Sequence, residues 1–184
     1  SIADTYKDYF LIGNVMSANQ TTDPELVAMY KHHYNVVTAE NDMKPQYLAP
    51  AKGRYNFMSA DMLVNWAIAN NIMVHGHTLV WHSQSPLWLT RSAGQPLTRA
   101  EARENLREYI TNVVGHFRGK VISWDVVNEA FADGVPVSTD WKTALRKNSP
   151  WYLAYENGAD KSKGESGADY IYDAFVFARL ADPD

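Results

Sequence analysis

The sequence predicts an α/β fold built on a parallel sheet, and three observations support this prediction. Four short apolar stretches alternate with four helical patterns along the 184 residues, without a tandem repeat. Hydrophobic residues make up 46% of the chain and charged residues 21%, which is ordinary for a globular domain with one core. The chain has no cysteine and no apolar run long enough for a membrane span, so we expect neither disulfides nor a membrane partner.

The bulk chemistry also narrows the class of partner. The formal net charge of -4 is small and spread along the chain, so nucleic acid is not an expected partner. Residues 1–10 lack the basic and apolar segments of an export signal, so we expect any such signal to be already removed or never present. The 6 Trp and 11 Tyr suit stacking on sugar rings, with core packing as the alternative.

Each expected strand is a run of mostly apolar residues bounded by turn residues. The four strands are expected at residues 10–18, 35–42, 72–81 and 121–127. The second strand leads into a loop with Pro45, Pro50 and Gly53, the third into an aromatic loop, and the fourth into a long polar crossover. We therefore expect helices to return the chain between successive strands.

The expected helices carry start and stop signals. Asp23 and Pro24 supply a cap and a first-turn proline, and residues 98–101 have a capping-box pattern. The four helices are expected at residues 24–34, 59–70, 99–117 and 168–180. Apolar residues of the third recur at the spacing of one helix face: Ala102, Leu106, Ile110, Val113 and Phe117. Asp182 and Pro183 close the last helix where a fifth strand would be due.

Four successive β-α units fit either an open doubly wound sheet or half of a (β/α)8 TIM barrel. No Gly-x-Gly-x-x-Gly or Gly-x-x-x-x-Gly-Lys loop follows the first strand, which weakens the nucleotide-binding form of the open sheet, and no cofactor is expected. Polar residues gather after strands two, three and four, as an active-site rim requires. The barrel is therefore favoured, with this chain supplying about the first four units.

Glu129 is the leading candidate for a catalytic residue. It follows Asn128 at the end of the apolar stretch 121–127, where α/β folds place their chemistry. A carboxyl group in a partly desolvated strand-end mouth can hold a proton near neutral pH and act as a general acid. The alternative is a helix-capping or ion-paired glutamate.

A second polar cluster follows strand two. Glu40, Asn41 and Lys44 combine an acceptor, an amide and a cation, which together can hold several hydroxyl groups in a fixed orientation. The alternative is a surface turn with a local salt bridge. This cluster predicts polar ligand binding beside strand two.

Three histidines accompany strand three. His75, His77 and His82 have no acidic or cysteine partner at matching spacing, so a zinc site is not expected. His77 near Trp81 combines an imidazole with an aromatic platform, which suits sugar recognition better than metal binding. A structural histidine is the alternative.

Three segments together strongly resemble glycoside hydrolase family 10, which consists mainly of endo-1,4-β-xylanases with (β/α)8 barrels. They are residues 38–44 (TAENDMK), 75–84 (HGHTLVWHSQ) and 124–130 (WDVVNEA). The resemblance covers nearly the whole chain and implies that Glu129 is the general acid/base of a retaining mechanism. It implies substrate-binding roles for Glu40, Asn41, Lys44, His77, Trp81, Asn128 and, as close neighbours, His82 and Gln84.

The resemblance also implies that the nucleophile, a Glu at the end of strand seven, is supplied by residues outside this chain. We therefore expect residues 1–184 to be the N-terminal half of a single catalytic barrel, active only with a complementary polypeptide that carries strands five to eight. Xylan and xylooligosaccharides are the expected substrates, and the expected location is secreted, periplasmic or at the cell surface. The alternatives are a catalytically inactive xylan-binding half-barrel or fragment and a self-sufficient open-sheet scaffold module.

Overall fold

The computed structural model describes residues 1–136 and 138–184, and its centre is a four-stranded parallel sheet. The strands are β1 (Gly13–Met16), β2 (Val36–Ala39), β3 (Met73–Val80) and β6 (Ser123–Val127), in the order β1-β2-β3-β6. Val36 pairs with both Gly13 and Met73, and His75 pairs with Ser123. The four predicted parallel strands are confirmed, although β1 and β2 are shorter than the apolar patterns that predicted them.

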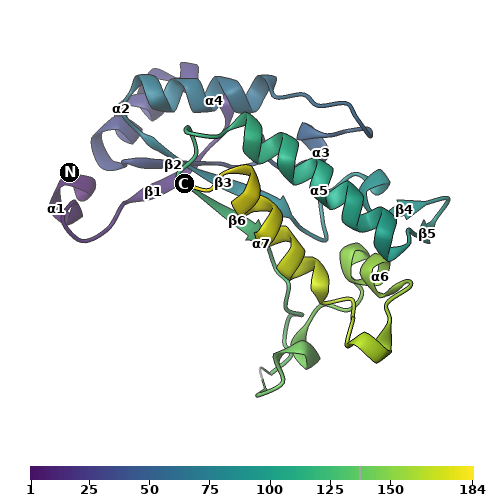
Figure 1. Cartoon of the computed structure of the whole chain (residues 1–184). Helices are drawn as coiled ribbons and strands as arrows, with labels where there is room; N and C mark the ends of the chain where they lie inside the picture. Colours follow the sequence, from purple (N-terminus) through teal and green to yellow (C-terminus); the bar gives the residue numbers. More distant parts are fainter. Residues whose placement is uncertain (137) are drawn as a thin grey trace.

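The four predicted helices are also confirmed. They are α2 (Pro24–His33), α4 (Met58–Ala69), α5 (Arg99–His116) and α7 (Asp169–Ala181). Asp23 caps α2 by accepting hydrogen bonds from two backbone N–H groups, and Thr98 forms the predicted capping box with Glu101 on α5. Figure 1 shows α5 and α7 running side by side in front of the sheet. Across residues 1–136 and 138–184, no helix combines the length and apolar character needed to cross a membrane.

Several short elements lie where the sequence predicted only loops. They are α1 (Ile2–Tyr6), α3 (Pro45–Leu48), α6 (Pro150–Glu156), the hairpin of β4 (Arg91–Ser92) and β5 (Gln95–Pro96), and four 3-10 turns at Ala18–Thr22, Leu87–Leu89, Trp141–Ala144 and Lys161–Lys163. Most of them span two turns or less, so they are too short to show a helical or strand period. The first-turn prolines of α3 and α6 were the available signal.

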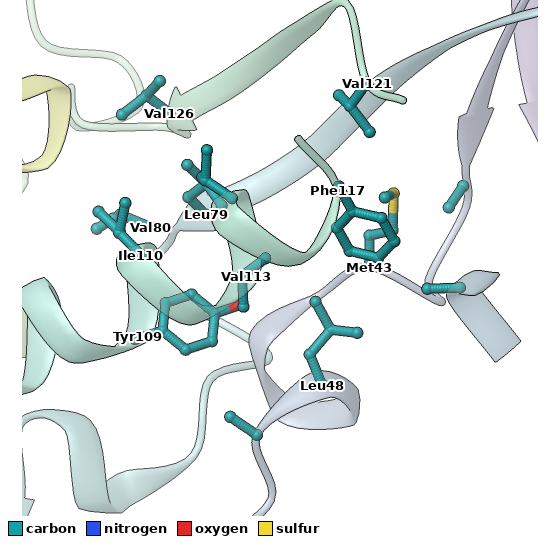
Figure 2. Close-up of a cluster of buried hydrophobic side chains, with 14 of the residues drawn as sticks. Met43, Leu48, Leu79, Val80, Tyr109, Ile110, Val113, Phe117, Val121 and Val126 are labelled. Carbon is teal, nitrogen blue, oxygen red and sulfur yellow. The ribbon is translucent and has the colours of Figure 1, made fainter. Parts of the chain in front are cut away.

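The helices and the sheet enclose an apolar core on one side of the sheet, which we call the outer face. Figure 2 shows part of this core, where Leu79 and Val80 of β3 meet Tyr109 and Ile110 of α5. On the same face the Trp124 ring lies directly over Gly76, and a Cβ atom at Gly76 would come within 2.2 Å of that ring. Glycine is therefore required at position 76 for the close approach of β3 and β6.

The opposite side of the sheet, which we call the inner face, is open. It forms a hollow lined by residues of all four strands, including Gly13, Val15, Thr38, His75, Ser123 and Asp125. Val15 is 53% exposed there. The predicted residues Trp81, His82, Asn128 and Glu129 line a separate small pocket beyond the carboxyl ends of β3 and β6.

Candidate active site

Glu129 is the second residue after β6 and is joined by a hydrogen bond to Trp81, the residue after β3. Val80 pairs with Val127, so the residues that follow the two strands, Trp81 and Glu129, come together. The indole Nε1–H of Trp81 donates a hydrogen bond to Glu129 Oε2 at 2.8 Å. Glu129 has φ 53°, a left-handed backbone conformation that costs energy in a non-glycine residue and is often found at functional sites.

The Glu129 side chain is 50% exposed. This exposure differs from the desolvated mouth that the apolar strand predicted, because only one flank of the carboxyl group is covered by described residues. The covered flank is formed by Trp81 and His82. Asn128 lines a small pocket together with Trp81, His82 and Glu129, and its backbone N–H donates to the carbonyl of Val80 at 2.8 Å.

Arg146 fixes the backbone that carries Glu129. Its Nε donates to the carbonyl oxygen of Glu129 at 3.3 Å, and its Nη2 donates to that of Phe131 at 3.3 Å. Nη2 also lies 3.2 Å from Asp133, and the Arg146 side chain is only 15% exposed. Sequence reasoning missed Arg146, because it lies in the crossover and has no spacing relation to the strand ends.

His82 lies on the covered flank of Glu129. Its Nε2 is 3.9 Å from Glu129 Oε2, which is too long for a hydrogen bond, and its buried Nδ1 has no hydrogen-bond partner among the described residues. Burial lowers the pKa of His82, and the Arg146 cation lowers it further, against the opposing charges of Glu129 and Asp133. His82 is therefore a neutral imidazole at neutral pH.

Lys44 is held at the end of β2 by two amide oxygens. Its Nζ donates to Asn41 Oδ1 at 2.8 Å and to Gln84 Oε1 at 2.7 Å, and it lies 5.2 Å from the centre of the Trp81 ring. Only 9% of Lys44 is exposed, which contradicts the alternative of a solvated surface turn at this residue. Glu40 remains exposed and accepts a hydrogen bond from Ser17 Oγ at 3.2 Å.

His75 and His77 share one carboxylate on the inner face. Asp125 Oδ2 lies 2.9 Å from His77 Nδ1, and Asp125 Oδ1 lies 3.2 Å from His75 Nε2. Partial burial raises the pKa of Asp125, but hydrogen bonds with His77 and His75 outweigh it, so the pKa lies below its usual range. The His77 and Trp81 rings are 6.3 Å apart and tilted by 54°, so the expected pair is adjacent without being stacked.

Asp125 is the acidic partner that the sequence spacing did not reveal. The register of the strands brings these residues together, because His77 pairs with Asp125 across β3 and β6. The cluster is a hydrogen-bonded network, since His75 Nδ1 also lies 2.7 Å from Ser123 Oγ. Over residues 1–136 and 138–184, no group of three or more His, Asp or Glu side chains is arranged to hold a metal ion.

Four parallel β/α units with a carboxyl group, an aromatic ring and a buried lysine at the strand ends define the chain as part of a (β/α)8 barrel. The chain belongs to glycosyl hydrolase family 10, whose sequence model matches residues 1–184. The resemblance seen in three segments and the predicted barrel class are thereby confirmed, with this chain supplying the N-terminal β/α units.

Curated relatives of the chain are xylanases. Endo-1,4-beta-xylanase A of Thermotoga neapolitana is 40% identical over 188 residues, which cover 100% of this chain and 16% of the relative. Endo-1,4-beta-xylanase A of Xylanibacter ruminicola is 37% identical over 187 residues, which cover 100% of this chain and 45% of the relative. The chain thus spans less than half the length of these proteins.

The fold of the chain is also similar to those of solved xylanase structures. A psychrophilic glycoside hydrolase family 10 endo-beta-1,4-xylanase superposes with a TM-score of 0.87 at 38% identity, covering 100% of this chain and 52% of that one. An intracellular xylanase mutant from Thermoanaerobacterium saccharolyticum, in complex with xylotriose, superposes with a TM-score of 0.83 at 35% identity. That alignment covers 99% of this chain and 53% of the other, so the chain spans about half of each solved structure.

Proposed function

We propose that this chain supplies the acid/base half of a retaining endo-1,4-β-xylanase that cleaves internal bonds of xylan and xylooligosaccharides. The observation that carries the proposal is Glu129, which presents a half-exposed carboxyl group at the end of β6 and is fixed by Trp81. The substrate class is supported by relatives that are endo-xylanases and by a solved neighbour in complex with xylotriose.

In the proposed reaction, Glu129 donates a proton to the glycosidic oxygen while a second carboxylate attacks the anomeric carbon. The bond to the leaving sugar breaks, and a covalent glycosyl-enzyme forms. Glu129, now ionised, then removes a proton from the water that hydrolyses this intermediate and regains its starting form. The second carboxylate has to lie about 5–5.5 Å from Glu129 and is a Glu supplied by residues outside this chain.

The remaining strand-end residues are proposed to hold the sugars. Lys44, fixed by Asn41 and Gln84, offers a positioned cation to hydroxyl oxygens, and the exposed carboxylate of Glu40 offers an acceptor. His77 and Trp81 form a wall next to the cleavage point, with His82 behind it. Asn128 is proposed to contact the 2-hydroxyl of the sugar whose bond is cleaved.

Residues 1–184 are proposed to form the N-terminal half of one catalytic barrel, active only when a complementary polypeptide supplies strands five to eight. The open inner face supports this proposal, because a closed barrel fills its interior with side chains from all eight strands. Intact-mass analysis of the active fraction provides the test. An active, folded monomer containing only the 184-residue polypeptide would contradict the proposal.

The substitution Glu129→Gln tests the catalytic assignment in the assembled enzyme. We expect hydrolysis of xylan to fall by about 10²–10⁴-fold, because the leaving oxygen is no longer protonated. A substrate with an activated aryl leaving group needs no acid and should keep a near-normal first step. Glu104→Gln, an exposed change on α5, is the matched control and should leave both rates unchanged.

Equal loss on both substrates would count against the acid/base assignment. A wild-type protein that binds xylooligosaccharides in calorimetry but releases no reducing sugar would favour the inactive xylan-binding half-barrel. Cooperative melting of the isolated chain without any response to sugar would favour the scaffold module.

The proposed location is outside the cytoplasm, secreted, periplasmic or at the cell surface, because a polymeric substrate cannot cross a membrane intact. The intracellular xylanase among the solved neighbours shows that the family alone does not fix the location. Xylanase activity found only in the cytoplasmic fraction, and absent from the medium, the washed intact cells and the periplasmic extract, would contradict this proposal.

A further inference from the structure

We propose that the indole N–H of Trp81 determines which oxygen of Glu129 transfers the proton, with Oε2 held as an acceptor and Oε1 acting as the acid. The inference rests on the proposed role of Glu129 as general acid/base. It gives Trp81 a positioning role that is separate from its role in the sugar-binding wall.

The contact between the two side chains specifies the donor and the acceptor. Trp81 Nε1 lies 2.8 Å from Glu129 Oε2. An indole nitrogen can only donate, so Oε2 has to accept, and the carbonyl oxygen of a neutral carboxyl group is a better acceptor than its hydroxyl oxygen. The proton of the neutral carboxyl group is therefore placed on Oε1.

The surroundings of the carboxyl group also favour a proton on Oε1. His82 lies on the Oε2 side, with Nε2 3.9 Å from that oxygen. Within residues 1–136 and 138–184, no hydrogen bond is made to Oε1. The half-exposed side chain thus has one oxygen fixed by the protein and one that accepts no hydrogen bond from the described residues.

The Trp81 ring is itself fixed from its face. Lys44 Nζ lies 5.2 Å from the ring centre and is held in place by Asn41 and Gln84. A cation near an indole face is attracted to the electrons of the ring. We infer that this interaction fixes the ring and strengthens the N–H donor, and thereby connects the end of β2 to the carboxyl group at the end of β6.

The arrangement also affects the two halves of the reaction differently. A hydrogen bond to the charged form of a carboxyl group stabilises that form. The ionised state is needed in the second step, when Glu129 removes a proton from water. Loss of the indole N–H should therefore move the alkaline limb of the pH–rate profile to higher pH.

Trp81→Phe removes the N–H donor and keeps a smaller aromatic face for the sugar. In the complete enzyme we expect the alkaline limb of kcat/KM to move up by roughly half to one pH unit. Trp88→Phe is the matched control, because Trp88 Nε1 donates to the backbone carbonyl of Ala49 at 2.8 Å. The control should leave the limb unchanged.

A second measurement does not depend on activity or on the folding of a variant. In protein labelled with ¹⁵N-tryptophan, the indole N–H resonance of Trp81 should titrate with pH together with the carboxyl group of Glu129. This titration should vanish in Glu129→Gln, and the Trp88 resonance should not show it. A Trp81 resonance that is independent of pH, or a folded Trp81→Phe enzyme with an unmoved alkaline limb, would overturn the inference.

Different results would contradict the proposed xylanase function and the proposed positioning role of Trp81. If the wild-type complete enzyme does not hydrolyse xylan, the proposed function fails, while the titration of the Trp81 resonance still reports the contact. If xylan is hydrolysed and the alkaline limb is unmoved in Trp81→Phe, only the positioning role fails.

Discussion

The two faces of the sheet differ in what covers them and in what they carry. On the outer face, Val37 and Val74 are completely buried beneath the helices. On the inner face, Val15 is 53% exposed and the Asp125 side chain 46% exposed. The outer face holds apolar side chains packed against one another, and the inner face holds hydrogen-bonded polar groups.

The two faces of the sheet therefore have different roles: the outer face contributes mainly to stability, and the inner face to the proposed chemistry. Burial of apolar area on the outer face supplies the favourable free energy of folding. The inner face and its strand ends carry imidazole and carboxyl groups, including those of the proposed active site. A substitution should therefore act on stability or on activity according to the face it occupies.

The largest effect is expected from a substitution in the core of the outer face, which should lower the stability of the fold. Leu106 of α5 is completely buried, so Leu106→Ala should lower the free energy of unfolding by about 2–5 kcal/mol through the cavity it leaves. His75→Ala on the inner face should change it by about 1 kcal/mol or less. Urea unfolding measures both, and equal losses would break the distinction between the faces.

Arg146 offers an intermediate test at the strand ends. Arg146→Lys keeps the positive charge but loses the fork that holds the carbonyl groups of Glu129 and Phe131, so Glu129 should be less well placed. We expect xylan hydrolysis by the complete enzyme to fall roughly tenfold, because a small misplacement of a catalytic group weakens its alignment with the reacting atoms.

Arg107→Lys, an exposed change on α5, is the control for this experiment and should leave the rate unchanged. The urea midpoint distinguishes misplacement from unfolding. A drop in midpoint as large as that of Leu106→Ala would assign Arg146 to the stability of the fold.

The smallest expected effect is a change in the pH dependence of stability on the inner face. The pKa of Asp125 is lowered in the folded chain, mainly because hydrogen bonds with His77 and His75 outweigh partial burial. A lowered pKa contributes stability above the unfolded value of about 3.9, and that contribution is lost as the pH falls through the folded value. Because the group is half exposed, the effect should be below about 1 kcal/mol.

Asp125→Asn should flatten this dependence. We expect the urea midpoint of the wild type to fall more than that of the variant as the pH is lowered from about 5 to about 3. Parallel curves for the two proteins would show that Asp125 does not titrate with folding.

The sequence predicted the elements whose pattern is long enough to read. The apolar spacing of residues 102–117 and the capping box at Thr98 located α5 to within a residue or two. The turn at Ala93 and Gly94, by contrast, depends on two residues with positive φ that connect strands of two residues each. Such a hairpin has no period to detect.

The sequence predicted which residues belong to the candidate site, but not how those residues contact one another. Glu129, Trp81 and Lys44 were each singled out from their strand ends, and the structure brings them together around one indole ring. The hydrogen bond from Trp81 to Glu129 depends on the register of β3 against β6, which a single sequence does not specify. Arg146 could not be predicted for the same reason, because its contact with Glu129 depends on the folded path of the crossover.

The shared carboxylate of Asp125 has a consequence for the closing of the barrel. In the proposed complete barrel other strands would cover the inner face, so water would leave His75, His77 and Asp125, and burying polar groups without partners costs several kcal/mol. Here both carboxylate oxygens are already engaged by imidazoles, and His75 is also engaged by Ser123. Much of the dehydration penalty of assembly is thereby avoided, because these groups keep their partners as the water leaves.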